Sequence, residues 1–128
     1  MAKGFGTAPN PWTCRIYQGH RIFASLKIAA QDGDPITRRN ATRTAILITS
    51  LLQEPTNTGC QCRLVHRLGD DAAQALMGLA VELGDVFRVV MVSPEGHVTA
   101  EGYSQKAAAM ERRLGTEKIR VVDPRRVG

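Results

Sequence analysis

The chain has 128 residues, 43% of them hydrophobic, and a formal net charge of +5 at pH 7. This length suits one domain with its own core. No stretch approaches the roughly 20 apolar residues that cross a bilayer, and the opening MAKGFGTAPNPW lacks the apolar segment of a secretory signal. Three cysteines are too few, and odd in number, for a secreted disulfide scaffold. We therefore expect a cytoplasmic protein without a membrane span, folded as a single domain over residues 1–128 with flexible tails at 1–11 and 124–128.

The positive charge is concentrated in one half of the chain. Residues 1–67 contain nine Lys and Arg against three Asp and Glu, whereas residues 68–128 contain eight against nine. The first half therefore carries a net charge of +6 and the second half a net charge of −1. A basic surface attracts anionic partners, so any such surface is expected from the first half.

The first predicted element is a hairpin, WTCRIYQGHRIFASLKIAA, with two strands around a tight turn at Gln18, Gly19 and His20. Successive residues of a strand point to opposite faces of a sheet, so one set faces the core and the other faces outward. The inward set is apolar and comprises Ile22, Ala24, Leu26 and Ile28. The outward set interleaves cations with aromatic rings and comprises Arg15, Tyr17, Arg21, Phe23, Ser25 and Lys27.

A helix is predicted over about 35–53, with its apolar residues along one side. Asp34 suits the N-cap, Pro35 suits the first helical position, and Pro55 lies beyond the end. The opening turns carry cations that oppose the helix dipole, so helix stability alone does not explain them. These cations are Arg38, Arg39 and Arg43.

The next segment, GCQCRLVHRL, is predicted to be a strand because apolar and polar residues alternate along it. In a strand His66 lies about 13 Å from Cys62, which is too far for both to bind one zinc ion. A metal site at the CxC pair would need Cys14 or His20 from the hairpin. We therefore predict buried structural thiols, with metal or redox chemistry as the alternative. One face of this strand would carry Cys60, Cys62, Leu64 and His66, and the other would carry Gln61, Arg63, Val65 and Arg67.

The second half of the chain begins with a predicted helix over 70–83 that is apolar on nearly all sides. Such a helix is expected to pack against a sheet or a second subunit. A strand, a turn and a strand follow over 86–103, then a helix over 104–115 and a last strand over 117–124. The order β-β-α-β-α-β-β-α-β predicts an α+β domain with a mixed or mainly antiparallel sheet and about three helices.

We find no catalytic or cofactor motif: the chain contains no GxxxxGK[ST], GxSxG or HExxH sequence. Ser93, Glu95 and His97 fit a β-turn better than a catalytic triad. Asp32 and Asp34 fit a loop residue and an N-cap better than a catalytic carboxylate pair. Ser104 begins a helix whose free N–H groups could bind an anion, but a cap explains it as well. We predict no catalytic residue, no metal and no cofactor. The sequence leans away from an enzyme without excluding one.

The function that the sequence favours is nucleic-acid binding, with single strands preferred. Cations that neutralise phosphates and rings that stack on bases are typical of proteins that bind single-stranded DNA or RNA. If the third strand lies beside the hairpin, its arginines extend the same face, and the helix arginines form a rim. The predicted contact residues are Arg15, Tyr17, Arg21, Phe23, Lys27, Arg38, Arg39, Arg43, Arg63 and Arg67.

Two other functions stay open. The apolar helix 70–83 and an edge strand suit a protein-interaction module or a homodimer. A small enzyme or ligand-binding domain would need a pocket near His66, His97, Asp85 or the cysteines. The first alternative predicts an oligomer that is insensitive to salt, and the second predicts a concave site with strongly perturbed titrating groups.

Overall fold

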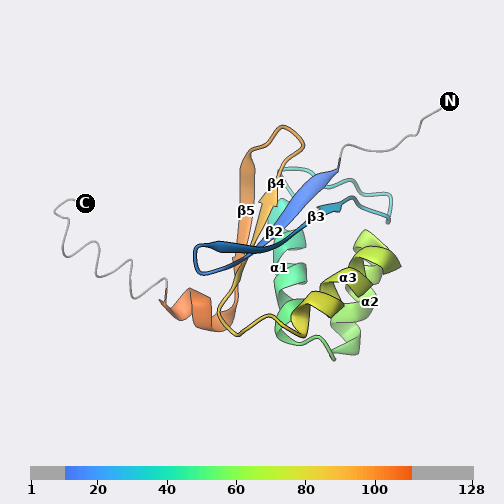
Figure 1. The fold of residues 1–128 in the computed structure, drawn as a ribbon. Helices are drawn as coiled ribbons and strands as arrows, with labels where there is room; N and C mark the ends of the chain where they lie inside the picture. Colours follow the sequence, from blue (N-terminus) through green and yellow to red (C-terminus); the bar gives the residue numbers. More distant parts are fainter. Residues whose placement is uncertain (1–10, 111–128) are drawn as a thin grey trace.

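Residues 11–110 are described by the computed structural model of the protein. They form a four-stranded antiparallel sheet in the order β3-β2-β4-β5, with α1, α2 and α3 on one of its faces (Figure 1). This architecture is the predicted α+β class. The strands are β2 (Trp12–Gln18), β3 (Arg21–Ile28), β4 (Arg88–Val92) and β5 (Val98–Tyr103). The helices are α1 (Ala41–Gln53), α2 (Thr58–Leu68) and α3 (Asp70–Ala80), and residues 105–110 begin a further helix.

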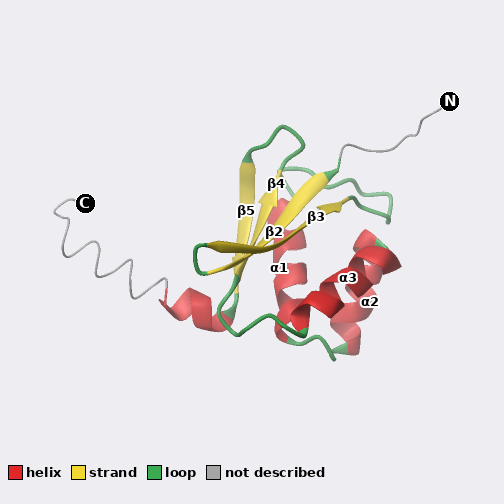
Figure 2. Ribbon diagram, viewed as in Figure 1, coloured by secondary structure: helices red, strands yellow, loops and turns green. Residues whose placement is uncertain are grey.

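The core lies between the sheet and the helices (Figure 2). Alternate side chains of the two central strands, including Cys14, Ile16 and Met91, are fully buried in one cluster with Ile48 of α1. α1 lies against β4 and β5, while α2 and α3 pack on α1 and on each other. These three helices therefore cover one face of the sheet and leave the opposite face free of them.

α1 approaches β5 so closely that no side chain fits between them. A Cβ added to Gly102 of β5 would clash with Thr49 Oγ1 and would lie 3.1 Å from the Ala45 carbonyl oxygen. Thr49 Oγ1 donates a hydrogen bond to that same carbonyl at 2.7 Å, which holds the hydroxyl in place. A residue without a Cβ is therefore required at this point of β5.

Both predicted hairpins are present. β2 and β3 pair antiparallel around Gly19, whose φ of 61° favours glycine. β4 and β5 pair around a turn in which Ser93 N–H donates to the His97 carbonyl at 2.8 Å and Ser93 Oγ accepts from His97 N–H at 3.1 Å. Ser93 and His97 therefore build the turn, as the sequence predicts, rather than a triad.

A bulge in β3 changes the predicted faces of the first hairpin. The register shifts between Ile16 and Tyr17, which pair with Ala24 and Ile22, so Phe23 is an extra residue on β3. An extra residue interrupts the alternation of side chains. Ile22 is consequently 56% exposed instead of inward, and Phe23 is half-buried against the core instead of outward.

The prediction of a strand over GCQCRLVHRL is wrong, because this segment lies within the helix α2. Asn57 caps the helix by accepting a hydrogen bond from Cys60 N–H at 3.0 Å, and Gly69 follows its end with a φ of 92°. In this short segment an alternating pattern and a helical stripe coincide, so periodicity alone does not separate them. The buried residues recur at every fourth position and are Cys60, Leu64 and Leu68.

The helix predicted from residue 35 begins at Ala41 instead. Asn40 Oδ1 accepts a hydrogen bond from Thr37 N–H at 2.8 Å, and Asn40 Nδ2 donates to the Pro35 carbonyl at 2.9 Å. These side-chain bonds compete with helical ones and hold the segment as a loop. As a result, Arg38 and Arg39 lie in the loop and not on the first turns of a helix.

α3 ends at Ala80, before the predicted limit of 83, and its Ala73 and Leu76 are fully buried. It contacts α1 and α2, so it belongs to the core of this domain. No helix within residues 11–110 has both the length and the apolar character needed to span a membrane. The end of the last predicted helix, the predicted strand 117–124 and nearly all of the predicted tails lie outside the described residues.

Gly102→Ala is expected to lower the free energy of unfolding by about 1–3 kcal/mol, because the added methyl group overpacks the contact between α1 and β5. Gly78 of α3 is the matched control, since a Cβ there meets nothing within 4 Å. Gly78→Ala should raise the free energy of unfolding by roughly 0.5–1 kcal/mol through helix propensity. Urea unfolding followed by circular dichroism measures both, and effects of the same sign would contradict the close approach.

Candidate functional sites

The outer face is the face of the sheet turned away from α1, α2 and α3, and it carries charged and aromatic side chains. The strand register places Arg15 beside Ser25 of β3 and Val90 of β4, and it places Tyr17 beside Arg88. The outer face therefore mixes residues from all four strands. Its members are Thr13, Arg15, Tyr17, Ile22, Ser25, Lys27, Arg88, Val90, Val92, Glu101 and Tyr103.

A row of contacts crosses the outer face from β2 to β5. Arg88 Cζ lies 4.3 Å from the centroid of the Tyr17 ring, which is a cation–π distance. Arg88 Nη1 lies 3.8 Å from Glu101 Oε1, and the Tyr103 hydroxyl donates to that oxygen at 2.7 Å. Exposed ion pairs of this kind contribute about 1 kcal/mol or less. The row therefore orders the two rings more than it stabilises the fold.

Arg15 and Lys27 add positive charge beside this row. Lys27 Nζ donates a hydrogen bond to Thr13 Oγ1 at 3.1 Å. Arg15 is half-buried and makes no hydrogen bond or ion pair with another described residue. With Arg88, these cations outnumber Glu101, so the outer face is net positive.

The structure divides the residues predicted to contact nucleic acid. Arg15, Tyr17 and Lys27 lie together on the outer face, and Arg21 is exposed beside the β2–β3 turn. Phe23 turns toward the core. The arginines of α1 and α2 do not extend the outer face, because the helices pack on the other side of the sheet. The remaining predicted residues are Arg38 and Arg39 in the loop, Arg43 on α1, and Arg63 and Arg67 on α2.

Two outer-face residues, Arg88 and Tyr103, are not among the contact residues predicted from the sequence. Both lie in the strand–turn–strand segment that the sequence predicts, so their secondary structure was readable. Their neighbours in the sheet were not predictable, because β4 pairs with β2, and β3 and the three helices separate these two strands in the chain. Local periodicity carries no signal for that pairing.

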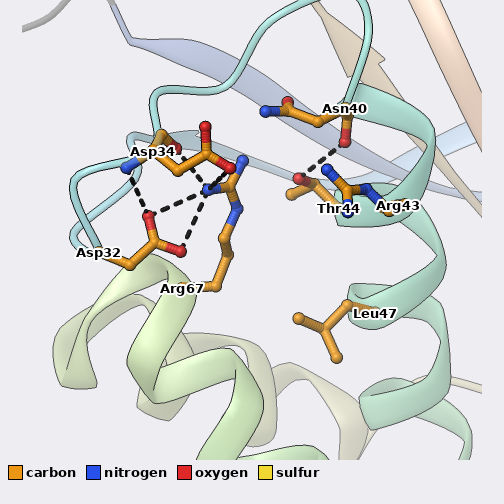
Figure 3. Close-up of a pocket in the computed structure, with 7 residues that line it drawn as sticks. All are labelled: Asp32, Asp34, Asn40, Arg43, Thr44, Leu47 and Arg67. Carbon is orange, nitrogen blue, oxygen red and sulfur yellow. Dashed lines mark hydrogen bonds and ion pairs between the residues drawn. The ribbon is translucent and has the colours of Figure 1, made fainter.

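A second candidate site is a pocket of about 190 Å³ between α1, α2 and the loop that precedes α1 (Figure 3). Arg67 Nη1 of α2 lies 3.0 Å from Asp32 Oδ1 and 3.2 Å from Asp32 Oδ2. The same nitrogen donates to the Asp34 backbone carbonyl and lies 3.6 Å from Asp34 Oδ2. The Arg67 and Asp32 side chains are only 11% and 13% exposed. The lining residues are Asp32, Asp34, Asn40, Arg43, Thr44, Leu47 and Arg67.

The hydrogen bonds around Asp32 favour its ionised form. Asp34 N–H donates to Asp32 Oδ1 at 3.0 Å, and this bond is the largest cause that lowers the pKa of Asp32. Desolvation raises the pKa, but the hydrogen bond and charge of Arg67 lower it further. Asp32 therefore stays charged at neutral pH and neutralises Arg67.

The three cysteines are free thiols in different surroundings. Cys14 is buried in β2, and burial raises its pKa to about 12. Cys60 is buried on α2, whereas Cys62 is exposed, so two of the three fit the predicted buried thiols. In the part of the chain that the structure describes, no three His, Cys, Asp or Glu side chains are grouped so as to hold a metal ion.

Ser104 is used as a helix cap. Its Oγ accepts hydrogen bonds from Phe87 N–H at 3.1 Å and from Ala107 N–H at 3.2 Å. Lys106 pairs with Asp85, with Nζ 3.1 Å from Oδ2. The start of this helix therefore fits capping, the simpler of the two expectations for Ser104.

No protein-family model matches this chain, and no similar protein was found among curated proteins or solved structures. The functional interpretation therefore rests on the chemistry and geometry of the outer face and the pocket.

A thiol reagent is expected to modify Cys62 quickly in the folded protein and to modify Cys14 and Cys60 only on unfolding. The thiolate is the reactive form, and burial both hides the Cys14 thiol and raises its pKa. Mass spectrometry after timed labelling counts the adducts. Cys62→Ser should remove the fast phase, and a fast phase that persists in this variant would show that α2 is placed wrongly.

Asp32→Asn is expected to lower the free energy of unfolding at neutral pH. Because the pKa of Asp32 is lowered in the folded state, the carboxylate stabilises the fold above its ordinary pKa of about 3.9. That stabilisation is lost as the pH falls through the folded-state pKa, so the variant and the natural sequence should converge below about pH 4. Urea unfolding across this pH range measures the difference. Glu95→Gln, in the exposed β4–β5 turn, is the control and should show no such convergence.

Proposed function

We propose that the protein binds single-stranded nucleic acid through the outer face of its sheet. The observation that carries this proposal is the placement of two tyrosines among three cations on a sheet face that α1, α2 and α3 leave uncovered. Rings that stack on unpaired bases, combined with cations that neutralise phosphates, are the usual means of binding single strands.

Tyr17 is the first proposed stacking platform. The Arg88 guanidinium already covers one side of its ring at 4.3 Å, which orders the ring before a ligand arrives. A base would stack on the other side, a contact worth about 1–3 kcal/mol. Tyr103 lies two strands away, roughly 10 Å at the usual strand spacing, and offers a second ring.

The cations of the outer face would contact phosphates. Within residues 11–110, Arg15 makes no hydrogen bond or ion pair that a phosphate would have to displace, and Lys27 donates only to the Thr13 hydroxyl. Glu101 opposes an anion, but it already accepts a hydrogen bond from Tyr103 and pairs with Arg88. Three phosphate contacts to a single strand predict a slope of about −2 for the logarithm of affinity against the logarithm of salt concentration.

The preference for single strands follows from the shape of the site. Duplex DNA is read by a helix or a narrow ribbon that enters a groove. The outer face is instead a four-stranded surface, and only unpaired bases can lie on its rings. The proposal includes DNA and RNA equally, and it places the protein in the cytoplasm, in line with its free thiols.

Self-assembly is the alternative function, and one observation favours it. β3 is an edge strand, and the bulge leaves Ile22 on it 56% exposed. An exposed edge can pair with a strand of another chain. α3 is a weaker interface than the sequence predicted, since Ala73 and Leu76 are already buried within the domain. A dimer that is insensitive to salt, without nucleic-acid binding, would support this alternative.

Fluorescence anisotropy with labelled single-stranded DNA, single-stranded RNA and duplex DNA tests the proposal. We expect single strands to bind with the salt slope given above. Tyr17→Leu keeps an apolar side chain but removes the stacking ring, so it should weaken binding by about 1–3 kcal/mol, or roughly five- to 150-fold. Arg15→Gln combined with Lys27→Gln should reduce the slope to about −0.7, because one phosphate contact remains.

Arg63→Gln is the matched control for the charge substitutions. Arg63 is exposed on α2, and its one described partner is Cys60 Sγ at 3.9 Å. This variant removes one positive charge from the helical side, half of what the double substitution removes, and should change the affinity by no more than about twofold. Unfolding curves show that each variant is folded. Equal losses from Arg63→Gln and from the Arg15 and Lys27 pair would place binding elsewhere, and no binding at low salt would exclude this function.

A further inference from the structure

The pocket between α1 and α2 has a chemistry that the proposed nucleic-acid function does not use. It is lined by residues of α1, α2 and the loop before α1, and no outer-face residue contributes to it. The inference drawn from it therefore does not rest on the outer face.

The α1 side of the pocket offers a free cation. The Arg43 side chain extends into the pocket from α1, opposite the Arg67 side chain from α2 (Figure 3). Arg43 makes no hydrogen bond or ion pair with any other residue in the range 11–110. Thr44 beside it is already engaged, because its hydroxyl donates to the Asn40 carbonyl at 3.2 Å. The group left unbonded on this side is therefore the Arg43 guanidinium, which is suited to bind the carboxylate of a ligand.

The loop side of the pocket offers an acid that is only partly engaged. Asp32 is fully engaged, since its carboxylate accepts bonds from Arg67 and from the Asp34 backbone. The Asp34 carboxylate is 63% exposed, and its contact with Arg67 is a 3.6 Å ion pair without a described hydrogen bond. Asp34 therefore keeps acceptor capacity for a cationic group. Arg43 and Asp34 together make the pocket dipolar, with opposite charges on opposite sides (Figure 3).

The pocket is small, and it has one apolar wall. A volume of about 190 Å³ lies below the roughly 300–1,000 Å³ of pockets that hold drug-sized ligands, so the pocket suits a small molecule. Leu47 of α1 lines the same space and can contact a short apolar group.

We propose that this pocket binds a small zwitterion, an α-amino acid with a short side chain. The ligand carboxylate pairs with Arg43, the ligand ammonium pairs with Asp34, and the side chain lies against Leu47. A simple carboxylate leaves Asp34 with only its 3.6 Å ion pair to Arg67 among the described residues, and a simple amine leaves Arg43 without a described partner. Because Arg67 is neutralised by Asp32, a phosphate dianion would meet the cation of Arg43 together with the carboxylate of Asp34, whereas a zwitterion complements both charges.

An NMR titration of the ¹⁵N-labelled full chain tests this site with free L-alanine, propionate, ethylamine and inorganic phosphate, each to roughly 10 mM. L-alanine should shift the amide signals of the pocket residues in a saturable way. The three other probes should bind at least about tenfold more weakly. No saturable shift with L-alanine would overturn the proposal. Propionate or phosphate binding as tightly as L-alanine would also overturn it, because the site would then recognise an anion alone.

Two substitutions and their matched controls locate the binding. Arg43→Gln and Asp34→Asn should each weaken L-alanine binding by at least about tenfold, while Arg63→Gln and Glu95→Gln should leave it unchanged. Signals outside the pocket report whether each variant is folded. Unchanged binding in Arg43→Gln or in Asp34→Asn would overturn the assignment. Oligonucleotide binding should persist in both, so failure of this site is distinguishable from failure of the outer face.

Discussion

The contact between α1 and β5 at Gly102 governs how the other elements are arranged. Because no Cβ separates them, the helix backbone at Ala45 and the Thr49 hydroxyl lie directly on the strand. α1 thereby fills the space over β4 and β5, and α2 and α3 pack chiefly on α1 and on each other. With these helices on one face, the sheet has one apolar side in the core and one side that α1, α2 and α3 do not cover.

The outer face results from the same alternation of side chains along the strands that builds the core. Cys14 and Ile16 of β2 point inward. Arg15 lies between them and Tyr17 follows Ile16, so both must point outward. The bulge at Phe23 alters this scheme on β3, because it moves one aromatic ring from the outer face to the core. The second ring of the outer face instead comes from β5.

The pocket depends on α2 being a helix. Its helical spacing buries Leu64 and Leu68 and at the same time directs Arg67 toward the loop that carries Asp32. The Gln31 N–H also donates to the Arg67 carbonyl at 2.8 Å, so the loop is held at the backbone and at the side chain. A charged group as buried as Arg67 requires a partner, and the lowered pKa of Asp32 keeps that partner ionised. This ion pair closes one side of the pocket and leaves Arg43 free on the other.

Turn residues and long periodic stretches are local signals, so the α+β class, both hairpins and a helix ending near Gln53 could be predicted from the sequence alone. It misread α2, where alternation and helical spacing coincide over a short segment and the deciding groups are the Asn57 cap and Gly69. Which residues share a site depends on how the elements pack, and the sequence pattern does not predict it. Arg88 reaches Tyr17 because β4 pairs with β2, and Arg67 reaches Asp32 because α2 packs beside the loop. Both contacts join segments far apart in the chain, and the burial of a common core, which no local pattern records, brings them together.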